Sequence, residues 1–366
     1  MKFTIITRYY HPTPDGIAHH SAYLHHYLTE AGHSVQVIYD DGIIGLHANE
    51  IGILVNKIKR QKADWVIFQY NGYSYNRFGA PSWLSKFYRR IRHAQDTRLC
   101  LIVHETYIRK ESSLKLRIYR FLQKRTLKKV SKYADLILTT THLYKSQLKE
   151  FNRKAHLAFT PSNFEDFIKE LAPETKTEGQ LVLGTFGNRD PEFLLNVLAH
   201  LDDLGLNCEF LFIGNYQPQY IKSIKEYTKK LKHIKISRSG KLTDRNIVKF
   251  LYRLDAFILL EPVRADMGGG LNTKSGSSAT ALCMGIPIFS TKGDFTDENV
   301  FKTDINYIQL DPENHIKSAK IIFNTVNEQE KLKLIGAAGK KLYEEEFSWP
   351  NYTAKILKLM EARNEK

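Results

Sequence analysis

The chain has 366 residues, 42% of them hydrophobic and 25% charged, and its 54 lysines and arginines against 39 aspartates and glutamates give a formal net charge of +15. This length and apolar content exclude an intrinsically disordered chain and suffice for two domains of ordinary size. The positive charge indicates an anionic partner, which by charge alone could be a nucleic acid, an anionic membrane face or a phosphorylated small molecule.

The first half of the chain alternates short apolar segments with helical ones. We expect strands at residues 2–7, 35–39, 64–70, 98–105 and 134–141, helices at 16–33 and 51–61, and two basic stretches at 84–95 and 109–132. Nearly continuous apolar strands separated by helices are typical of a buried parallel sheet with helices on both faces. The pattern predicts a Rossmann-like domain, in which ligands bind beyond the carboxyl ends of the strands.

A second series of strands and helices follows the segment 171–180, LAPETKTEGQ, whose proline and charges indicate a linker. Its expected strands lie at 181–187, 209–215, 234–240, 256–262 and 286–291. We therefore expect two similar α/β domains, at 1–172 and 173–346. Residues 347–366 form a further helix with Ser348 as its cap and Pro350 in its first turn, and by sequence it fits against either domain.

Chemically active residues follow two of the first-domain strands. A long loop reaches Gly16 where a helix begins, a place that favours an anion, although an ordinary loop glycine is the alternative. His104 and Glu105 follow the fourth strand, where such a pair positions a sugar hydroxyl, accepts a proton or stabilises a developing cation. The alternative is a surface polar pair. No metal site is expected, because the histidines of the first helix lack the three- or four-residue spacing that aligns ligands on one face.

Glycine-bearing strand ends recur in the second domain. Arg189 follows one strand in GTFGNRDP, Gly240 follows another in SRSGKL, and the glycine- and serine-rich loop 268–278 follows a third. A single glycine at a strand end is common, but three at one sheet edge predict a nucleotide or phosphate pocket.

Taken in order, several motifs resemble glycosyltransferases of the GT-B fold, and among them the retaining enzymes of family 4 (group 1). The motifs span nearly the whole chain: YYHPTPDGIAHHSAYLHHYLTEAGHSVQVI, VHE, VSKYADLILTTT, FIGN, SGKLTDRNIVKFLYRLDAFILLEP, ATALCMGIPIFST and FSW. The resemblance implies two Rossmann-like domains facing each other across a cleft, with the nucleotide sugar held mainly by the second and the acceptor mainly by the first. It also implies that the C-terminal helix crosses back to the first domain.

The resemblance further implies roles for individual residues. Gly16 would lie beside the donor diphosphate, His104 against the donor sugar, and Arg189 would pair with the diphosphate. Glu105 stays a catalytic candidate from its position beside His104. The base would be received by the backbone of Gly240, Lys241 and Leu242. In retaining members the leaving phosphate assists the incoming hydroxyl, so the resemblance implies neither a metal nor a cofactor besides the donor.

The chain departs from the family at two glutamates that are usually separated by seven residues. Aligned on GIP, these positions hold Asn272 and Thr280, which bond sugar hydroxyls less strongly than carboxylates do. Glu261 and Asp266 are nearby carboxylates that could replace one contact. The family's lysine after the arginine is also absent, and we expect Lys274 to replace it, together with donors at the following helix start: Ser275, Gly276, Ser277 and Ser278.

Positive charge is concentrated in the acceptor-side domain, at 86–93 and 109–132, where cations alternate with apolar residues. Such a segment can lie on an anionic membrane surface, each cation contributing about 1 kcal/mol. The alternative is a solvated helix that packs its apolar face on the sheet. We expect no nucleic-acid partner, because no nucleic-acid-binding motif is present.

Three widely separated cysteines argue against a disulfide framework, and we find neither a signal peptide nor an apolar run long enough to span a membrane. We therefore expect a cytoplasmic protein, peripheral on the inner face of the cytoplasmic membrane. It would transfer a sugar from a nucleotide donor to a glycan or lipid-linked acceptor, in bacterial surface polysaccharide or lipopolysaccharide synthesis. Two other hypotheses stay open: a catalytically silent nucleotide-sugar- or glycan-binding scaffold of a glycan assembly complex, and a nucleotide-sugar epimerase of the same fold.

Overall fold

The chain folds into two α/β units. The structure, a computed structural model, describes residues 1–11, 13, 15–39, 48–92, 97–109, 113–151, 153–171, 179–260 and 269–364. Within that part, unit 1 comprises the residues up to Phe159 and those from Trp349 onward, and unit 2 runs from Thr160 to Ser348. Unit 2 thus begins before the expected boundary at 172, because helix α7 (Glu165–Glu170) bonds within it: Tyr252 Oη donates to the Ile168 carbonyl, and Tyr343 Oη to Glu165.

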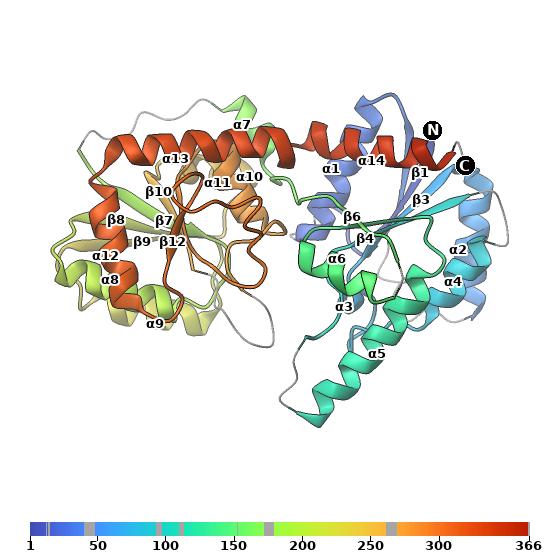
Figure 1. The fold of residues 1–366 in the computed structure, drawn as a ribbon, viewed down its shortest axis with the longest axis horizontal. Coiled ribbons are helices and arrows are strands. Elements are labelled where there is room, and N and C mark those ends of the chain that lie inside the picture. Colours follow the sequence, from blue (N-terminus) through green and yellow to red (C-terminus); the bar gives the residue numbers. More distant parts are fainter. Residues whose placement is uncertain are drawn as a thin grey trace. The chain divides into compact units, whose positions relative to one another are not determined.

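Unit 1 contains a six-stranded parallel sheet in the order β2-β1-β3-β4-β5-β6 (Figure 1). Its strands are β1 (Lys2–Ile6), β2 (Ser34–Ile38), β3 (Trp65–Tyr70), β4 (Arg98–Val103), β5 (Leu136–Thr139) and β6 (His156–Leu157). Its first six helices are α1 (Gly16–Glu30), α2 (Ala48–Gln61), α3 (Gly72–Tyr75), α4 (Trp83–Arg92), α5 (Leu114–Ser131) and α6 (His142–Lys149). The strand order reverses between β1 and β3, so the residues after these two strands flank the usual ligand position of such a sheet.

Alternate residues of each strand point to opposite faces of this sheet. On β3, Val66 and Phe68 join the core under α2, α4 and α5, whereas Trp65 and Ile67 join the core under α1. The strands β3, β4 and β5 are buried on both faces and form nearly continuous apolar runs in the sequence, whereas the edge strand β2 is only partly buried.

The C-terminal helix α14 (Trp349–Asn364) completes the second of these cores. Trp349 is fully buried and stacks on Tyr23 and Tyr27 of α1, with ring centroids 5.3 and 5.9 Å apart. The helix thus returns to unit 1, as the resemblance implied. Ser348 directly precedes this helix, as expected. Its hydroxyl donates to the Glu344 carbonyl (3.3 Å), a bond that was not predicted.

Unit 2 contains a second six-stranded parallel sheet, in the order β12-β11-β10-β7-β8-β9. Its strands are β7 (Val182–Phe186), β8 (Cys208–Ile213), β9 (Ile234–Gly240), β10 (Ala256–Leu259), β11 (Ile288–Thr291) and β12 (Ile308–Leu310). Besides α7, its helical elements are α8 (Glu192–Asp203), α9 (Pro218–Thr228), α10 (Asp244–Tyr252), α11 (Gly276–Met284), α12 (His315–Val326), α13 (Gln329–Leu342) and a π-helical turn η2 (Tyr343–Phe347). Here the strand order reverses between β7 and β10.

All ten strands expected from the sequence are confirmed. The short edge strands β6 and β12 were not predicted, because two or three residues form no recognisable apolar run. Among the helices of the described residues, none combines the length and apolar content needed to cross a membrane.

Candidate functional site

In unit 1, helix α1 begins beside the switch point of the sheet. Asp15 caps it, and its carboxylate accepts from the amides of Ile17 (2.9 Å) and Ala18 (3.0 Å). A Cβ placed on Gly16 would meet nothing within 4 Å, so the glycine leaves open space at the helix start. A ligand could therefore approach the backbone closely at Gly16, although Asp15 already occupies two of the amides that an anion would use.

A hydrogen-bonded network lies behind His104, which follows β4 and is half-buried. His104 Nε2 lies 2.6 Å from Gln69 Oε1, and Gln69 Nε2 lies 3.3 Å from Nδ1 of His20 on α1. His20 Nε2 in turn lies 3.0 Å from the hydroxyl of Tyr352 on α14. Gln69 is fully buried and His20 nearly so. Strand β3 and helices α1 and α14 thus jointly hold the His104 ring.

This network determines where the protons of both rings lie. Burial, and then the nearby His104 ring, hold the pKa of His20 well below its usual value, so His20 is neutral. With the Gln69 amide nitrogen donating to His20 Nδ1, the Gln69 side-chain oxygen accepts a hydrogen bond from the N–H of His104 Nε2. The other ring nitrogen of a neutral His104 is then a hydrogen-bond acceptor.

Two other residues belong to this end of the unit 1 sheet. Glu105, the predicted neighbour of His104, is half-buried in the segment after β4. Arg8, which was not predicted, follows β1 and donates from Nη1 to the Ser74 carbonyl (2.8 Å), while its Nε is buried without a hydrogen-bond partner among the described residues. Its position in TRYYHP, directly after the first strand, is the signal that could have identified it.

In unit 2, Arg189 connects the end of β7 to the start of α11. Its guanidinium donates to the Phe186 carbonyl and, from Nη2, to Ser277 Oγ (2.7 Å). Gly187 allows this conformation, because its φ is +110° and a Cβ there would lie 2.6 Å from Arg189 Nη1. The strand end therefore presents a half-buried cation at the N-terminus of a helix.

The N-terminus of α11 is an exposed group of donors. Ser275 is its cap and accepts from the Ser278 amide (3.3 Å), which leaves the amides of Gly276 and Ser277 at the half-exposed end. Lys274 precedes the cap, with its ammonium 4.8 Å from the centre of the Phe295 ring. Ser278 differs from its neighbours: it is 1% exposed, and its hydroxyl donates to the Ser275 carbonyl (2.9 Å). The Ser278 hydroxyl thus bonds within the loop, and its expected role as a donor to the ligand stays a prediction.

The two positions that replace the family's glutamates are also buried. Asn272 is 5% exposed; its amide donates to the Gly270 carbonyl (2.9 Å) and its oxygen accepts from the Lys274 amide (3.2 Å). Thr280 is 0% exposed, donates to the Gly276 carbonyl (2.7 Å) and bonds the Ser162 hydroxyl (2.9 Å). Both side chains are enclosed and hold the loop and helix together, and their expected contact with sugar hydroxyls stays a prediction.

Replacing Thr280 by glutamate is expected to destabilise the protein by about 3–5 kcal/mol at pH 8, because the carboxylate would be buried without a cationic partner. Burial raises the carboxyl pKa in the folded state, so stability falls as pH rises above the unfolded-state pKa, and the loss is smaller at pH 5. Thermal melts at both pH values measure this effect.

Thr280→Val is the control, since it removes the hydroxyl without adding charge and should cost about 1 kcal/mol at either pH. A Thr280→Glu protein that melts like the wild type and binds nucleotide more tightly would contradict the buried role.

Of the predicted base contacts, Gly240 is the last residue of β9, and Lys241 and Leu242 follow it. Gly240 has a φ of +68° and forms an isolated bridge with Gly214 at the end of β8. Lys241 is exposed and Leu242 half-buried, so this turn offers backbone groups at the surface of unit 2. Glu261 and Asp266 lie outside the described residues.

No protein-family model matches the chain, and no curated protein is similar to it in sequence. Several solved structures, by contrast, are similar in fold to this chain over nearly the whole length of both chains. Sucrose-phosphate synthase from Thermosynechococcus elongatus covers 100% of this chain and 99% of its own, with a TM-score of 0.68 and 12% identity. HepE from Anabaena, solved with UDP and glucose, covers 99% and 100%, with a TM-score of 0.65 and 13% identity. The catalytic domain of starch synthase IV from Arabidopsis thaliana, bound to ADP and acarbose, covers 100% and 99%, with a TM-score of 0.62 and 11% identity.

These neighbours are GT-B glycosyltransferases, and at such low identity the likeness concerns the fold alone. The two parallel six-stranded sheets, the alternating helices and the return of α14 to unit 1 agree with it. The chain therefore has the GT-B fold.

Proposed function

We propose that this protein is a glycosyltransferase that takes a sugar from a nucleotide-diphosphate donor held by unit 2. The observation that carries the proposal is the link between Arg189 and Ser277, which places a guanidinium at the N-terminus of α11 (2.7 Å). A cation beside helix amides is suited to a diphosphate, because both the charge and the helix dipole favour an anion there. The sugar-nucleotide complexes of structural neighbours, UDP with glucose in HepE and ADP with acarbose in starch synthase IV, support this choice.

Breaking the bond between sugar and diphosphate leaves negative charge on the departing phosphate. Arg189, Lys274 and the amides of Gly276 and Ser277 would stabilise that charge, and fixed donors are most effective where charge develops in the transition state. We propose that transfer proceeds with retention and without a metal, the leaving phosphate accepting the proton of the incoming hydroxyl. In unit 1, His104 would contact the donor sugar through the ring that Gln69 orients.

For the acceptor we propose a glycan or lipid-linked glycan of bacterial surface polysaccharide or lipopolysaccharide synthesis, at the inner face of the cytoplasmic membrane. A second candidate function is a catalytically silent nucleotide-sugar- or glycan-binding scaffold in a glycan assembly complex. Burial of Asn272 and Thr280 favours it, because the positions that hold the family's two glutamates contribute no exposed polar group.

Incubation with a panel of nucleotide sugars, with and without a membrane extract that contains acceptors, tests these functions. A transferase releases nucleoside diphosphate slowly without acceptor and faster with it. Binding of a donor without release under either condition would favour the scaffold, and isomerisation of the donor without acceptor would identify an epimerase. If the protein neither bound a donor nor released nucleoside diphosphate from any of them, the proposal as a whole would be contradicted.

Replacing Lys274 by alanine should weaken nucleoside diphosphate binding about tenfold, the loss expected for one charge-assisted contact. The melting temperature should change little, because the lysine is only half-buried. Calorimetric titration with UDP and ADP measures the affinity. Lys222→Ala, which removes an exposed lysine of α9 in the same unit, is the control and should bind like the wild type. Equal affinities in all three proteins would remove Lys274 from the site.

A further inference from the structure

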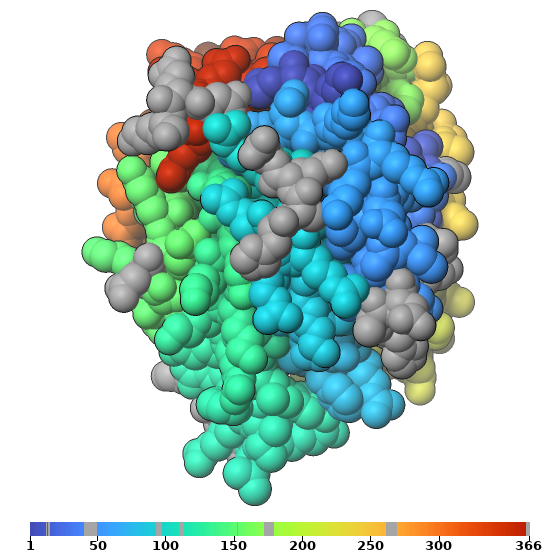
Figure 2. Space-filling view, turned by 90° about the vertical axis from the view of Figure 1, so that its right-hand side faces the viewer, coloured from blue at the N-terminus to red at the C-terminus, as the bar shows by residue number. Residues whose placement is uncertain are grey.

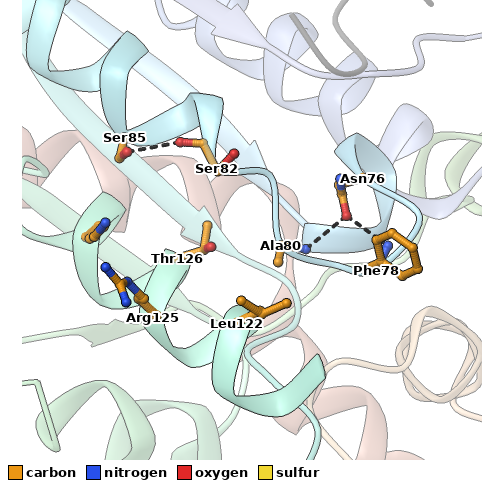
Figure 3. A pocket seen from close by; sticks show the side chains of 9 residues that line it. Asn76, Phe78, Ala80, Ser82, Ser85, Leu122, Arg125 and Thr126 are labelled. Carbon is orange, nitrogen blue, oxygen red and sulfur yellow. Dashed lines mark hydrogen bonds between the residues drawn. The ribbon is translucent and has the colours of Figure 1, made fainter. Parts of the chain in front are cut away.

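A pocket outside the candidate site lies within unit 1, between α5 and the segment 76–85 that leads into α4 (Figure 3). Its volume is about 300 Å³. Arg125 and Lys129 line it from α5, Ser82 and Ser85 line it from the start of α4, and Leu122 adds an apolar edge. None of the nine described residues that line it is acidic.

The wall of this pocket is held in place by hydrogen bonds. The Asn76 side-chain oxygen accepts from the amides of Phe78 (2.8 Å) and Ala80 (3.4 Å), as Figure 3 shows. Gln123 of α5, which is 1% exposed, donates to the Phe78 carbonyl (2.9 Å). The segment 76–80 is thereby attached to α5, and the pocket is preformed.

The charge of this pocket is uncompensated. Arg125 and Lys129 are four residues apart and therefore adjacent on one face of α5. Both are exposed, and among the described residues neither has an ion-pair partner. Lys124 on the same helix does have one, since its ammonium lies 2.7 Å from the Glu150 carboxylate. Two unpaired cations beside the Ser82 hydroxyl are a binding arrangement for a phosphate group, while the Ser85 hydroxyl donates to the Ser82 carbonyl (3.0 Å).

An apolar surface continues from the edge of the pocket along α5. Leu114, Ile118, Phe121 and Leu122 are 73%, 51%, 62% and 40% exposed, and their spacing places them on one side of the helix. Figures 1 and 2 show the start of α5 projecting from the rest of unit 1. The helix has seven lysines and arginines and no acidic residue. A helix with exposed apolar side chains among cations is suited to the boundary between lipid head groups and acyl chains.

We propose that the pocket binds the phosphate head group of an anionic membrane lipid, while the apolar side chains of α5 insert among the neighbouring lipids. Leu122 belongs to both surfaces, so a lipid whose head group occupies the pocket has its acyl chains beside the helix. This assignment goes beyond sugar transfer and does not depend on it, because the residues concerned are separate from Arg189, Lys274 and His104.

Flotation with phosphatidylcholine vesicles, with and without phosphatidylglycerol, tests the proposal on the full chain. The wild type should bind only the anionic vesicles. Arg125→Gln/Lys129→Gln should bind them about thirtyfold more weakly, the effect of two cations near an anionic surface. Lys222→Gln/Lys225→Gln, on α9 of unit 2, removes the same charge from exposed lysines and should bind like the wild type. Phe121→Ser should also bind weakly, because its side chain would no longer insert.

The proposal would be overturned if the wild type did not bind anionic vesicles, or if Phe121→Ser bound them like the wild type. Equal losses in the two double variants would also overturn it, because they would indicate general charge attraction. Calorimetry with glycerol phosphate separates a lipid from a free phosphate. Binding as tight as to vesicles would assign the pocket to a soluble phosphate compound instead. All variants should keep the wild-type melting temperature and nucleotide affinity, so failure here is distinguishable from failure of the proposed function.

Discussion

Arg189→Ala is expected to lower kcat/KM for the nucleotide-sugar donor by about 10²–10³, the loss seen when one donor to a developing oxyanion is removed. The guanidinium lies at the junction of β7 and α11, where the departing diphosphate would develop its charge. Nucleoside diphosphate affinity should fall as well, since the product carries the same group. Steady-state kinetics of diphosphate release and calorimetric titration measure the two effects.

Ser277→Ala provides the matched control for Arg189. It removes the bond to the guanidinium but keeps the charge and the helix amides, so a loss of about tenfold or less is expected. If Arg189→Ala retained wild-type kinetics while Ser277→Ala did not, the hydroxyl and not the cation would contact the donor.

His104→Ala is expected to reduce kcat about 10²-fold, because the donor sugar would lose the ring that positions it. Gln69→Leu should give a smaller loss in kcat with an unchanged KM, since the imidazole remains but its Nε2 loses the bond that fixes its proton (2.6 Å).

Tyr352→Phe is the control for this network, because it removes the far bond to His20 and leaves the bond between Gln69 and His104 intact. Its kinetics should resemble those of the wild type. A His104→Ala protein with wild-type kcat would remove His104 from the site. A Gln69→Leu protein with wild-type kcat would limit Gln69 to a structural role.

Most of the strands were predictable because burial on both sheet faces makes central strands such as β3, β5 and β8 nearly unbroken apolar runs, whereas the edge strands β2 and β9 are only partly buried. Arg189 was predictable in position for a related reason: it directly follows such a run, and parallel strands end at one edge. The network behind His104 was not predictable. Gln69 lies inside an apolar strand, where its sequence context is that of a core residue, and Tyr352 is brought to His20 only by the return of α14.

The burial of Asn272 and Thr280 was not predictable either. Helix α11, GSSATALCM, consists of small and apolar residues all round, so its sequence does not distinguish an inner from an outer face. Asn272 precedes the helix in a polar loop, a context typical of an exposed residue. Its side-chain oxygen nevertheless accepts a hydrogen bond from the backbone amide of Lys274, two residues further along the chain. Short polar side chains that bond their own backbone are indistinguishable in sequence from those that bind a ligand.

The placement of α14 also determines the order in which the chain is able to fold during its synthesis. Trp349, Tyr352, Ile356 and Met360 complete one core of unit 1, but all four are translated after the whole of unit 2. The described part of unit 2 lies between the two parts of unit 1 in sequence, so it can reach its native packing before α14 is synthesised. One face of the unit 1 sheet, which α1 and α14 cover together, is then only partly covered. Until then, the nascent chain exposes the aromatic surface of Tyr23 and Tyr27 on which Trp349 later stacks.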